Sequence, residues 1–186
     1  MRVMLRYLST GHPVRYWCLD ETRLGLKTIT GRVITLAGVK PEGLVGWNRQ
    51  NFYLYGVIEP ATGASFFWEF SHPDSLCFQR FLELFSQAFA ESLNLVQMGN
   101  GRFHQSTALK LPENVLPIFQ PAHSPQLNPI ERLWQHLKQA LRWENCAKLD
   151  ELRQKVSEVL KAITPEVIAS ICGWNYITSA LLSATS

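Results

Sequence analysis

The N-terminal part of the chain consists of short runs of β-branched, aromatic and aliphatic residues separated by turn residues. Runs of this kind are typical of strands with at least one buried face. The pattern predicts strands over residues 14–20, 29–38, 51–59 and 64–70. The segment PATG at 60–63 separates the last two strands and predicts a hairpin between them.

From residue 75 onward, the apolar positions follow a helical repeat. Residues 75–90 have apolar side chains every three or four positions, and Asp74 stands where it could cap the N-terminus of this helix. Two short apolar runs, at 93–98 and 115–120, predict further strands.

The C-terminal part predicts helices only. Asn128 as N-cap and Pro129 as first helical residue favour a helix start. One face of this helix is apolar: Ile130, Leu133, Trp134, Leu137 and Leu141. Further helices are expected at about 147–162 and after Pro165. The order of elements predicts an α/β domain, with a mixed β-sheet flanked by helices and with helices at its C-terminus.

Composition supports one folded domain over residues 1–186. Hydrophobic residues make up 46% of the chain and charged residues 18%, as in ordinary globular proteins. No apolar run approaches the roughly 18 residues that a membrane span needs, and Arg6 interrupts the N-terminal apolar stretch. The four cysteines form no CxxC pair, which favours free buried thiols in a reducing, cytoplasmic setting.

Charge is unevenly distributed along the chain. Residues 1–49 carry 8 basic and 3 acidic side chains, a net charge of +5, whereas the remainder carries 10 basic and 12 acidic side chains, a net charge of −2. A basic N-terminal part is compatible with a polyanionic partner, because Lys and Arg neutralise phosphates. Ordinary solvated surface charge explains the same pattern, so charge alone does not select a function.

The most distinctive stretch is SPQLNPIERLWQHLK at residues 124–138. Its Ser-Pro, Leu-Asn-Pro and Glu-Arg-x-Trp order resembles the C-terminal catalytic motif of DDE transposases, in the bacterial insertion-sequence branch of the Tc1/mariner superfamily. The resemblance covers about residues 14–145 and implies an RNase H-like fold. It also implies that Glu131 is the third metal ligand of that family. Without the resemblance, capping and the helix dipole would explain an acid at this position.

The same resemblance places the first catalytic Asp at Asp20, at the end of the first predicted strand, with Glu21 after it. Strand alternation should direct Glu21 to the opposite face. The family's second Asp precedes an Asn and falls at Gly99, before Asn100. The offset, 131 − 99 = 32, is close to the superfamily's spacing. Glycine offers no ligand, so the expected triad is reduced to two acids.

Neighbouring side chains are poor replacements for the missing Asp. The family's match continues after Asn100 with Gly101, Phe103 and His104. Asn100 is one residue out of phase on a strand, and its amide should point away from the site. His104 is a soft ligand for Mg²⁺, and a local hydrogen-bonding role explains it better.

The resemblance implies a function in DNA transposition. In an intact relative, three acids would hold two Mg²⁺ or Mn²⁺ ions for hydrolysis of a phosphodiester and strand transfer by the freed 3′-OH. Here metal binding and cleavage should be weakened. DNA is the expected partner, and no membrane partner is expected. Residues 1–13 are too short for an N-terminal helix-turn-helix module, so a separate DNA-reading chain or a homodimer is possible.

A different class of function remains open from the sequence: a non-enzymatic DNA-binding or assembly module derived from a transposase. The two hypotheses differ in geometry. A third carboxylate near Asp20 and Glu131, for instance from Glu21 or Asp74, would restore the enzyme, whereas two isolated acids would leave it impaired.

Overall fold

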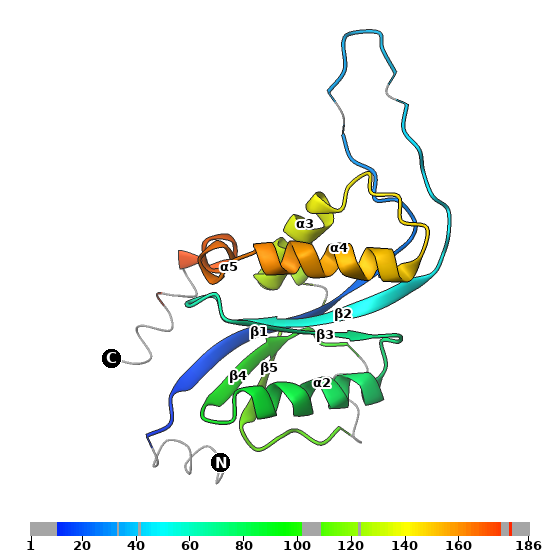
Figure 1. Cartoon of the computed structure of the whole chain (residues 1–186). Coiled ribbons are helices and arrows are strands. Elements are labelled where there is room, and N and C mark those ends of the chain that lie inside the picture. Colours follow the sequence, from blue (N-terminus) through cyan, green and yellow to red (C-terminus); the bar gives the residue numbers. More distant parts are fainter. Residues whose placement is uncertain are drawn as a thin grey trace.

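The computed structural model describes residues 11–32, 34–40, 42–101, 109–122, 124–175 and 179. Its centre is a five-stranded sheet in the order β3-β2-β1-β4-β5 (Figure 1). The strands are β1 (Val14–Gly25), β2 (Asn51–Ile58), β3 (Ser65–Phe70), β4 (Leu93–Met98) and β5 (Val115–Phe119). Antiparallel pairing joins β1, β2 and β3, and β4 and β5 run parallel to β1. The sheet is therefore mixed, as predicted.

Helices cover both faces of the sheet. α2 (Ser75–Ala88) packs on one face, and α3 (Ile130–Ala140), α4 (Leu149–Ala162) and α5 (Pro165–Cys172) lie on the other (Figure 1). A short 3₁₀ turn, Pro125–Leu127, precedes α3. Within the part of the chain that the structure describes, no helix is both long enough and apolar enough to cross a membrane.

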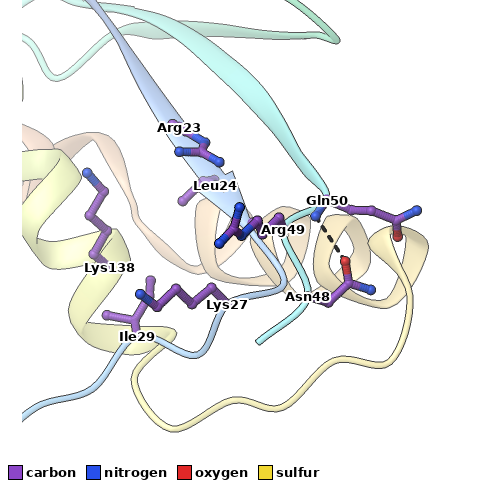
Figure 2. A pocket seen from close by; sticks show the side chains of 9 residues that line it. Arg23, Leu24, Lys27, Ile29, Asn48, Arg49, Gln50 and Lys138 are labelled. Carbon is purple, nitrogen blue, oxygen red and sulfur yellow. Dashed lines mark hydrogen bonds between the residues drawn. The ribbon is translucent and has the colours of Figure 1, made fainter. Parts of the chain in front are cut away.

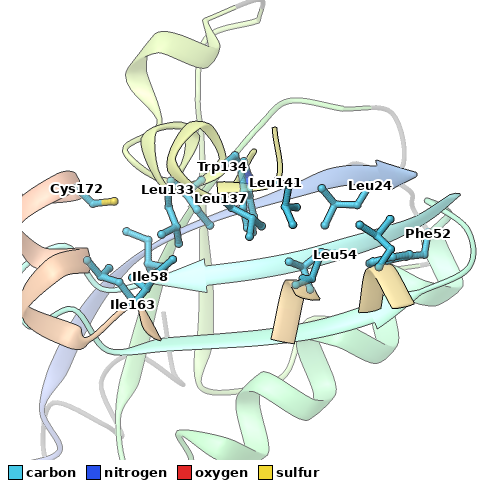
Figure 3. Close-up of a cluster of buried hydrophobic side chains, with 14 of the residues drawn as sticks. Leu24, Phe52, Leu54, Ile58, Leu133, Trp134, Leu137, Leu141, Ile163 and Cys172 are labelled. Atoms are coloured by element: carbon cyan, nitrogen blue, oxygen red, sulfur yellow. The ribbon is translucent and has the colours of Figure 1, made fainter. Parts of the chain in front are cut away.

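Two apolar cores result, one on each side of β1. Trp17 and Leu19 of β1 pack with the phenylalanines of α2, whereas Cys18 and Leu24 pack with α3 and its neighbours. Figure 3 shows the second core, where side chains from the sheet meet those of α3. Successive side chains of β1 therefore point alternately into one core and the other, so the parity of a β1 residue indicates which face of the sheet it lies on.

Local signals at the hairpin and at α2 predicted the structure correctly. β2 and β3 pair from Ile58↔Ser65 to Tyr53↔Phe70, around the predicted turn. Asp74 caps α2, because the backbone N–H of Cys77 donates to Asp74 Oδ1 at 2.8 Å.

The strand predicted over residues 29–38 is wrong. The described residues of this segment form no strand, and Ile29 makes only an isolated bridge to Arg142. Ile34 and Leu36 are 100% and 81% exposed, so no apolar layer holds them. The described residues of the segment 26–50 instead form a long excursion between β1 and β2 that projects from the body of the domain (Figure 1). The apolar run alone gave a false strand signal.

β1 is also longer than predicted. It continues five residues beyond Asp20, to Gly25, because β2 pairs with it along that whole stretch. Its parallel pairing with β4 ends at Cys18↔Gln97. Asp20 therefore lies inside β1 rather than at its end. It is two residues beyond Cys18, the last β1 residue that pairs with β4.

Candidate active site

Three segments that are distant in sequence meet at one pocket of about 160 Å³. Asp20 comes from β1, Gly99 from the end of β4, and Glu131 from the first turn of α3. The structure thus brings together all three positions that the sequence analysis singled out. The other polar residues of the wall are Asn100, Gln120, Ser124 and Asn128. Asn100 thus lines the pocket, although strand alternation predicted that its amide would point away from the site.

Alternation along β1 directs Asp20 toward α3. Cys18 and Leu24, which share its parity, belong to the core under α3. Glu21 has the parity of Trp17 and Leu19, which face α2. This confirms that Asp20 and Glu21 lie on opposite faces of the strand.

Position 99 lies on the same face as Asp20. Val96 and Met98 of β4 pack toward α2, so residues 97 and 99 face the other way. Gln97 does so, because its Nε2 donates to the carbonyl oxygen of Leu127 at 2.9 Å, beside the start of α3. The parallel pairing of β1 with β4 ends at Cys18↔Gln97. Continuing this register by two residues on each strand places position 99 beside Asp20.

Gly99 leaves room for a side chain. A Cβ at this position would meet no atom within 4 Å. Its φ is also not positive, in contrast to those of Gly11, Gly38 and Gly63 among the described glycines. Neither space nor backbone conformation therefore requires glycine here.

Trp134 of α3 holds Asp20 from one side. Its Nε1 donates to Asp20 Oδ2 at 3.0 Å, and its ring is buried in the core. Gly56, the β2 partner of Asp20, makes room for that ring: a Cβ there would lie 2.5 Å from Trp134 Cη2. The sequence predicted Trp134 as core only and missed this hydrogen bond. The available signal was the Glu-x-x-Trp spacing, which puts Trp134 on the same side of the helix as Glu131.

Asn128 has a different role from the predicted one. α3 begins at Ile130, with Pro129 rather than Asn128 as the capping residue. The Asn128 side chain instead donates from Nδ2 to the carbonyl oxygen of Leu19 at 2.9 Å. This buried hydrogen bond ties the start of α3 to β1, one residue before Asp20, and so fixes where Glu131 stands.

The pocket disfavours the charged form of both acids. Burial raises the pKa of Asp20 to about 7, and the negative charges of Glu21 and Glu131 add to the effect. Burial also raises the pKa of Glu131, and the positive charge of Lys138 partly opposes that shift. A pair of facing, poorly solvated carboxylates is the environment in which a bound cation is most favourable.

A third Asp, Glu, His or Cys ligand is not found within the described ranges. No group of three or more His, Cys, Asp or Glu side chains there could hold a metal ion. Glu21 faces the other core, and Asp74 is engaged in capping α2. Phe103 and His104, which complete the sequence resemblance, lie outside the described residues.

The chain is an α/β domain in which acids from β1 and from the first turn of α3 lie on one face of a mixed sheet. Residues 15–153 match the family of DDE superfamily endonucleases. The chain belongs to this family, and the sequence resemblance is thereby confirmed.

Two relatives illustrate the match. The chain is 28% identical over 164 residues to the insertion element IS630 uncharacterized 39 kDa protein of Shigella sonnei. That alignment covers 84% of this chain and 47% of that protein, so the chain spans about half of its relative. It is also 26% identical over 87 residues to the uncharacterized protein y4pE/y4sA of Sinorhizobium fredii, covering 46% of this chain and 64% of that one.

Solved structures of the Mos1 transposase share the fold. The Mos1 strand transfer complex matches with a TM-score of 0.69 at 14% identity, over 92% of this chain and 54% of that one. The Mos1 mariner paired end complex with Mn matches with a TM-score of 0.66, also at 14% identity, over 92% and 56%. At this identity the likeness concerns the fold, which is RNase H-like, as predicted.

Proposed function

We propose that this chain is the catalytic domain of a DDE-type transposase in which one of three metal ligands has been lost. Asp20 and Glu131 are the retained ligands, and Gly99 occupies the position of the missing Asp. The observation that carries the proposal is the shared pocket, where position 99 opens onto the same space as both acids. Membership of the DDE endonuclease family supports the same assignment.

The residues present fit a divalent ion in part. Carboxylate oxygens are the hard ligands that Mg²⁺ and Mn²⁺ accept, and the raised pKa of each acid reflects charge that a cation would neutralise. Asp20 and Glu131 would hold such an ion, with Trp134 orienting the Asp20 carboxylate. When bound, the ion would supply activation of the attacking oxygen and stabilisation of the leaving oxygen.

Loss of the third ligand should impair cleavage. Removing a group that only orients a ligand typically costs about 10–100-fold in affinity or activity, and a ligand itself should cost more. A loss of about 10³-fold corresponds to roughly 4 kcal/mol in the activation barrier. We therefore expect the natural chain to nick DNA very slowly or not at all.

DNA is the proposed partner. The structural neighbours include a Mos1 transposase described as a paired-end complex with the left transposon end. The net charge of +5 over residues 1–49 suits a polyanion. The chain spans about half of its relative from Shigella sonnei. A separate DNA-reading chain or a homodimer is part of this proposal.

The test is nicking of supercoiled plasmid in Mg²⁺ or Mn²⁺. Gly99→Asp should nick faster than the natural chain, because the open space at Gly99 admits the carboxylate and completes three ligands. Gly99→Asn is the matched control, with nearly the same size and no charge, and should stay as slow as the natural chain. Adding Glu131→Gln to Gly99→Asp should remove the gain.

Two results would overturn the proposal. If folded Gly99→Asp is as inert as Gly99→Asn, the missing carboxylate is not the defect. If the natural chain nicks readily and Glu131→Gln abolishes this activity, a ligand at another position already completes the site.

A further inference from the structure

A second pocket, of about 240 Å³, lies where β1 ends and β2 begins (Figure 2). Four cationic residues line it: Arg23, Lys27, Arg49 and Lys138. They come from β1, from both ends of the 26–50 excursion and from α3, so the tertiary fold rather than a local sequence run gathers them. We call this the basic pocket.

The positive charges of the basic pocket are offset by protein only in part, through the charge of Lys138 acting on Glu131. No acidic side chain contributes to its lining, which also includes the amide side chains of Asn48 and Gln50. Across the described ranges, none of the four cationic side chains forms an ion pair. Lys27 contacts the Trp47 ring, with its Nζ 4.9 Å from the ring centroid. Like charges gathered at one pocket repel one another, and an anion would relieve that repulsion.

The donors match a phosphate. Arg guanidinium groups bind phosphate oxygens through two parallel N–H donors, and Lys adds a compact charge. Amide groups such as those of Asn48 and Gln50 supply neutral donors. Arg23, Lys27 and Arg49 are exposed, so an extended polymer has access to them as well as a small ion.

The basic pocket lies along the same elements as the acids. Arg23 follows Asp20 by three residues on β1, which is about 10 Å along a strand, but strand alternation gives its side chain the parity of Glu21 rather than that of Asp20. Lys138 follows Glu131 by seven residues on α3, which is also about 10 Å along a helix. A nucleic-acid strand advances about 3.4 Å per nucleotide, so this separation equals roughly three nucleotides.

We propose that the basic pocket binds a backbone phosphate of the DNA, and that the phosphodiester about three nucleotides away on the same strand reaches Asp20 and Glu131. The inference rests on the proposed function, since it takes DNA as the substrate. The pocket contributes no base recognition, because its donors address phosphate oxygens. It therefore positions the strand rather than reading its sequence.

The test compares two double variants of the 186-residue chain. Arg49→Gln with Lys138→Gln removes two charges from the basic pocket. Arg80→Gln with Lys110→Gln removes two charges on the α2 side of the sheet, so the net charge is matched. Both are compared with the natural chain by fluorescence anisotropy with a labelled duplex over about 50–200 mM salt, after thermal melts confirm folding.

The pocket variant should weaken binding at least about tenfold in ~0.1 M salt and lower the slope of log affinity against log salt by roughly two. The control variant should keep the slope of the natural chain. If both variants bind alike while the natural chain binds DNA, the inference fails and the proposed function stands. If the natural chain binds no DNA, both fail.

A small phosphate-containing ligand would bind to the same cationic and amide donors as a DNA phosphate. Calorimetric titration with inorganic phosphate and with pyrophosphate separates the two sources. Tight pyrophosphate binding that the pocket variant loses, together with unchanged DNA binding, would make this a small-anion site and overturn the inference. Weak binding of both anions, with DNA binding lost in the pocket variant, supports it.

Discussion

Replacement of Asp20 by Asn should stabilise the metal-free protein at neutral pH. Asn is nearly the same size as Asp, carries no charge, and still offers an oxygen to the Nε1 of Trp134, which donates to Asp20 at 3.0 Å. The change therefore removes one partly buried negative charge and little else. In the natural chain, burial and the charges of Glu21 and Glu131 raise the pKa of Asp20 to about 7.

The pH dependence follows from the direction of this shift. An acid with a pKa near 7 in the folded state and about 4 in the unfolded state holds its proton more tightly when folded. Below about pH 4 both states are protonated and the residue costs nothing. As pH rises toward 7 only the unfolded state gains by ionising, so stability is lost, and the loss levels off once the folded carboxyl also ionises.

The size of the effect has an upper bound. A shift of roughly 3 pH units corresponds to at most about 4 kcal/mol at neutral pH. The Asp20 side chain is partly exposed, and solvent screening lowers this to about 1–3 kcal/mol. For a chain of this length, 2 kcal/mol is roughly 4–8 °C in the melting temperature.

The assay is thermal or urea unfolding in EDTA at several values between about pH 5 and pH 8. The stability advantage of Asp20→Asn should grow with pH and reach a plateau above about pH 7. Glu158→Gln, which removes the same charge from the exposed side of α4, is the control and should show a flat difference. If the stability differences of Asp20→Asn and Glu158→Gln depend on pH in the same way, the site does not disfavour the ionised form of Asp20.

Two further predictions concern packing. Gly56→Ala should lower the free energy of unfolding by about 1–3 kcal/mol, because its Cβ would lie 2.5 Å from Trp134 Cη2; an unchanged urea midpoint would contradict this packing. Cys18 and Cys172 are buried free thiols whose pKa burial raises to about 12. They should resist a thiol reagent until the protein unfolds, while the other two cysteines react sooner; four equally fast thiols would refute the burial.

Much of the fold was predictable because local signals agreed with the tertiary arrangement. The turn at 60–63 and the cap at Asp74 both act through short-range hydrogen bonds that sequence displays directly. The segment 29–38 shows the limit. Its apolar residues have strand-like character, but Ile34 finds no surface to pack on, and only tertiary contacts decide that.

The site residues that belong to a sequence motif were predictable, whereas the contacts that depend on tertiary packing were not. Asp20 and Glu131 were found through the resemblance, since their distance in sequence hides their proximity. The hydrogen bond from Trp134 to Asp20, with Gly56 making room for the indole, requires β2 and α3 to be placed first. Asn128 was misassigned because capping is the commoner role of Asn at that position, whereas here it bonds to Leu19.

The most direct measurement of the central claim is a calorimetric titration of Mn²⁺ into the natural chain and into Gly99→Asp, with Gly99→Asn as control. The account predicts weak binding to the natural chain and to Gly99→Asn, and at least about tenfold tighter binding to Gly99→Asp. Adding Asp20→Asn to Gly99→Asp should remove the gain. Equal affinity of Gly99→Asp and Gly99→Asn, or tight binding by the natural chain, would contradict a metal site that lacks its ligand at position 99.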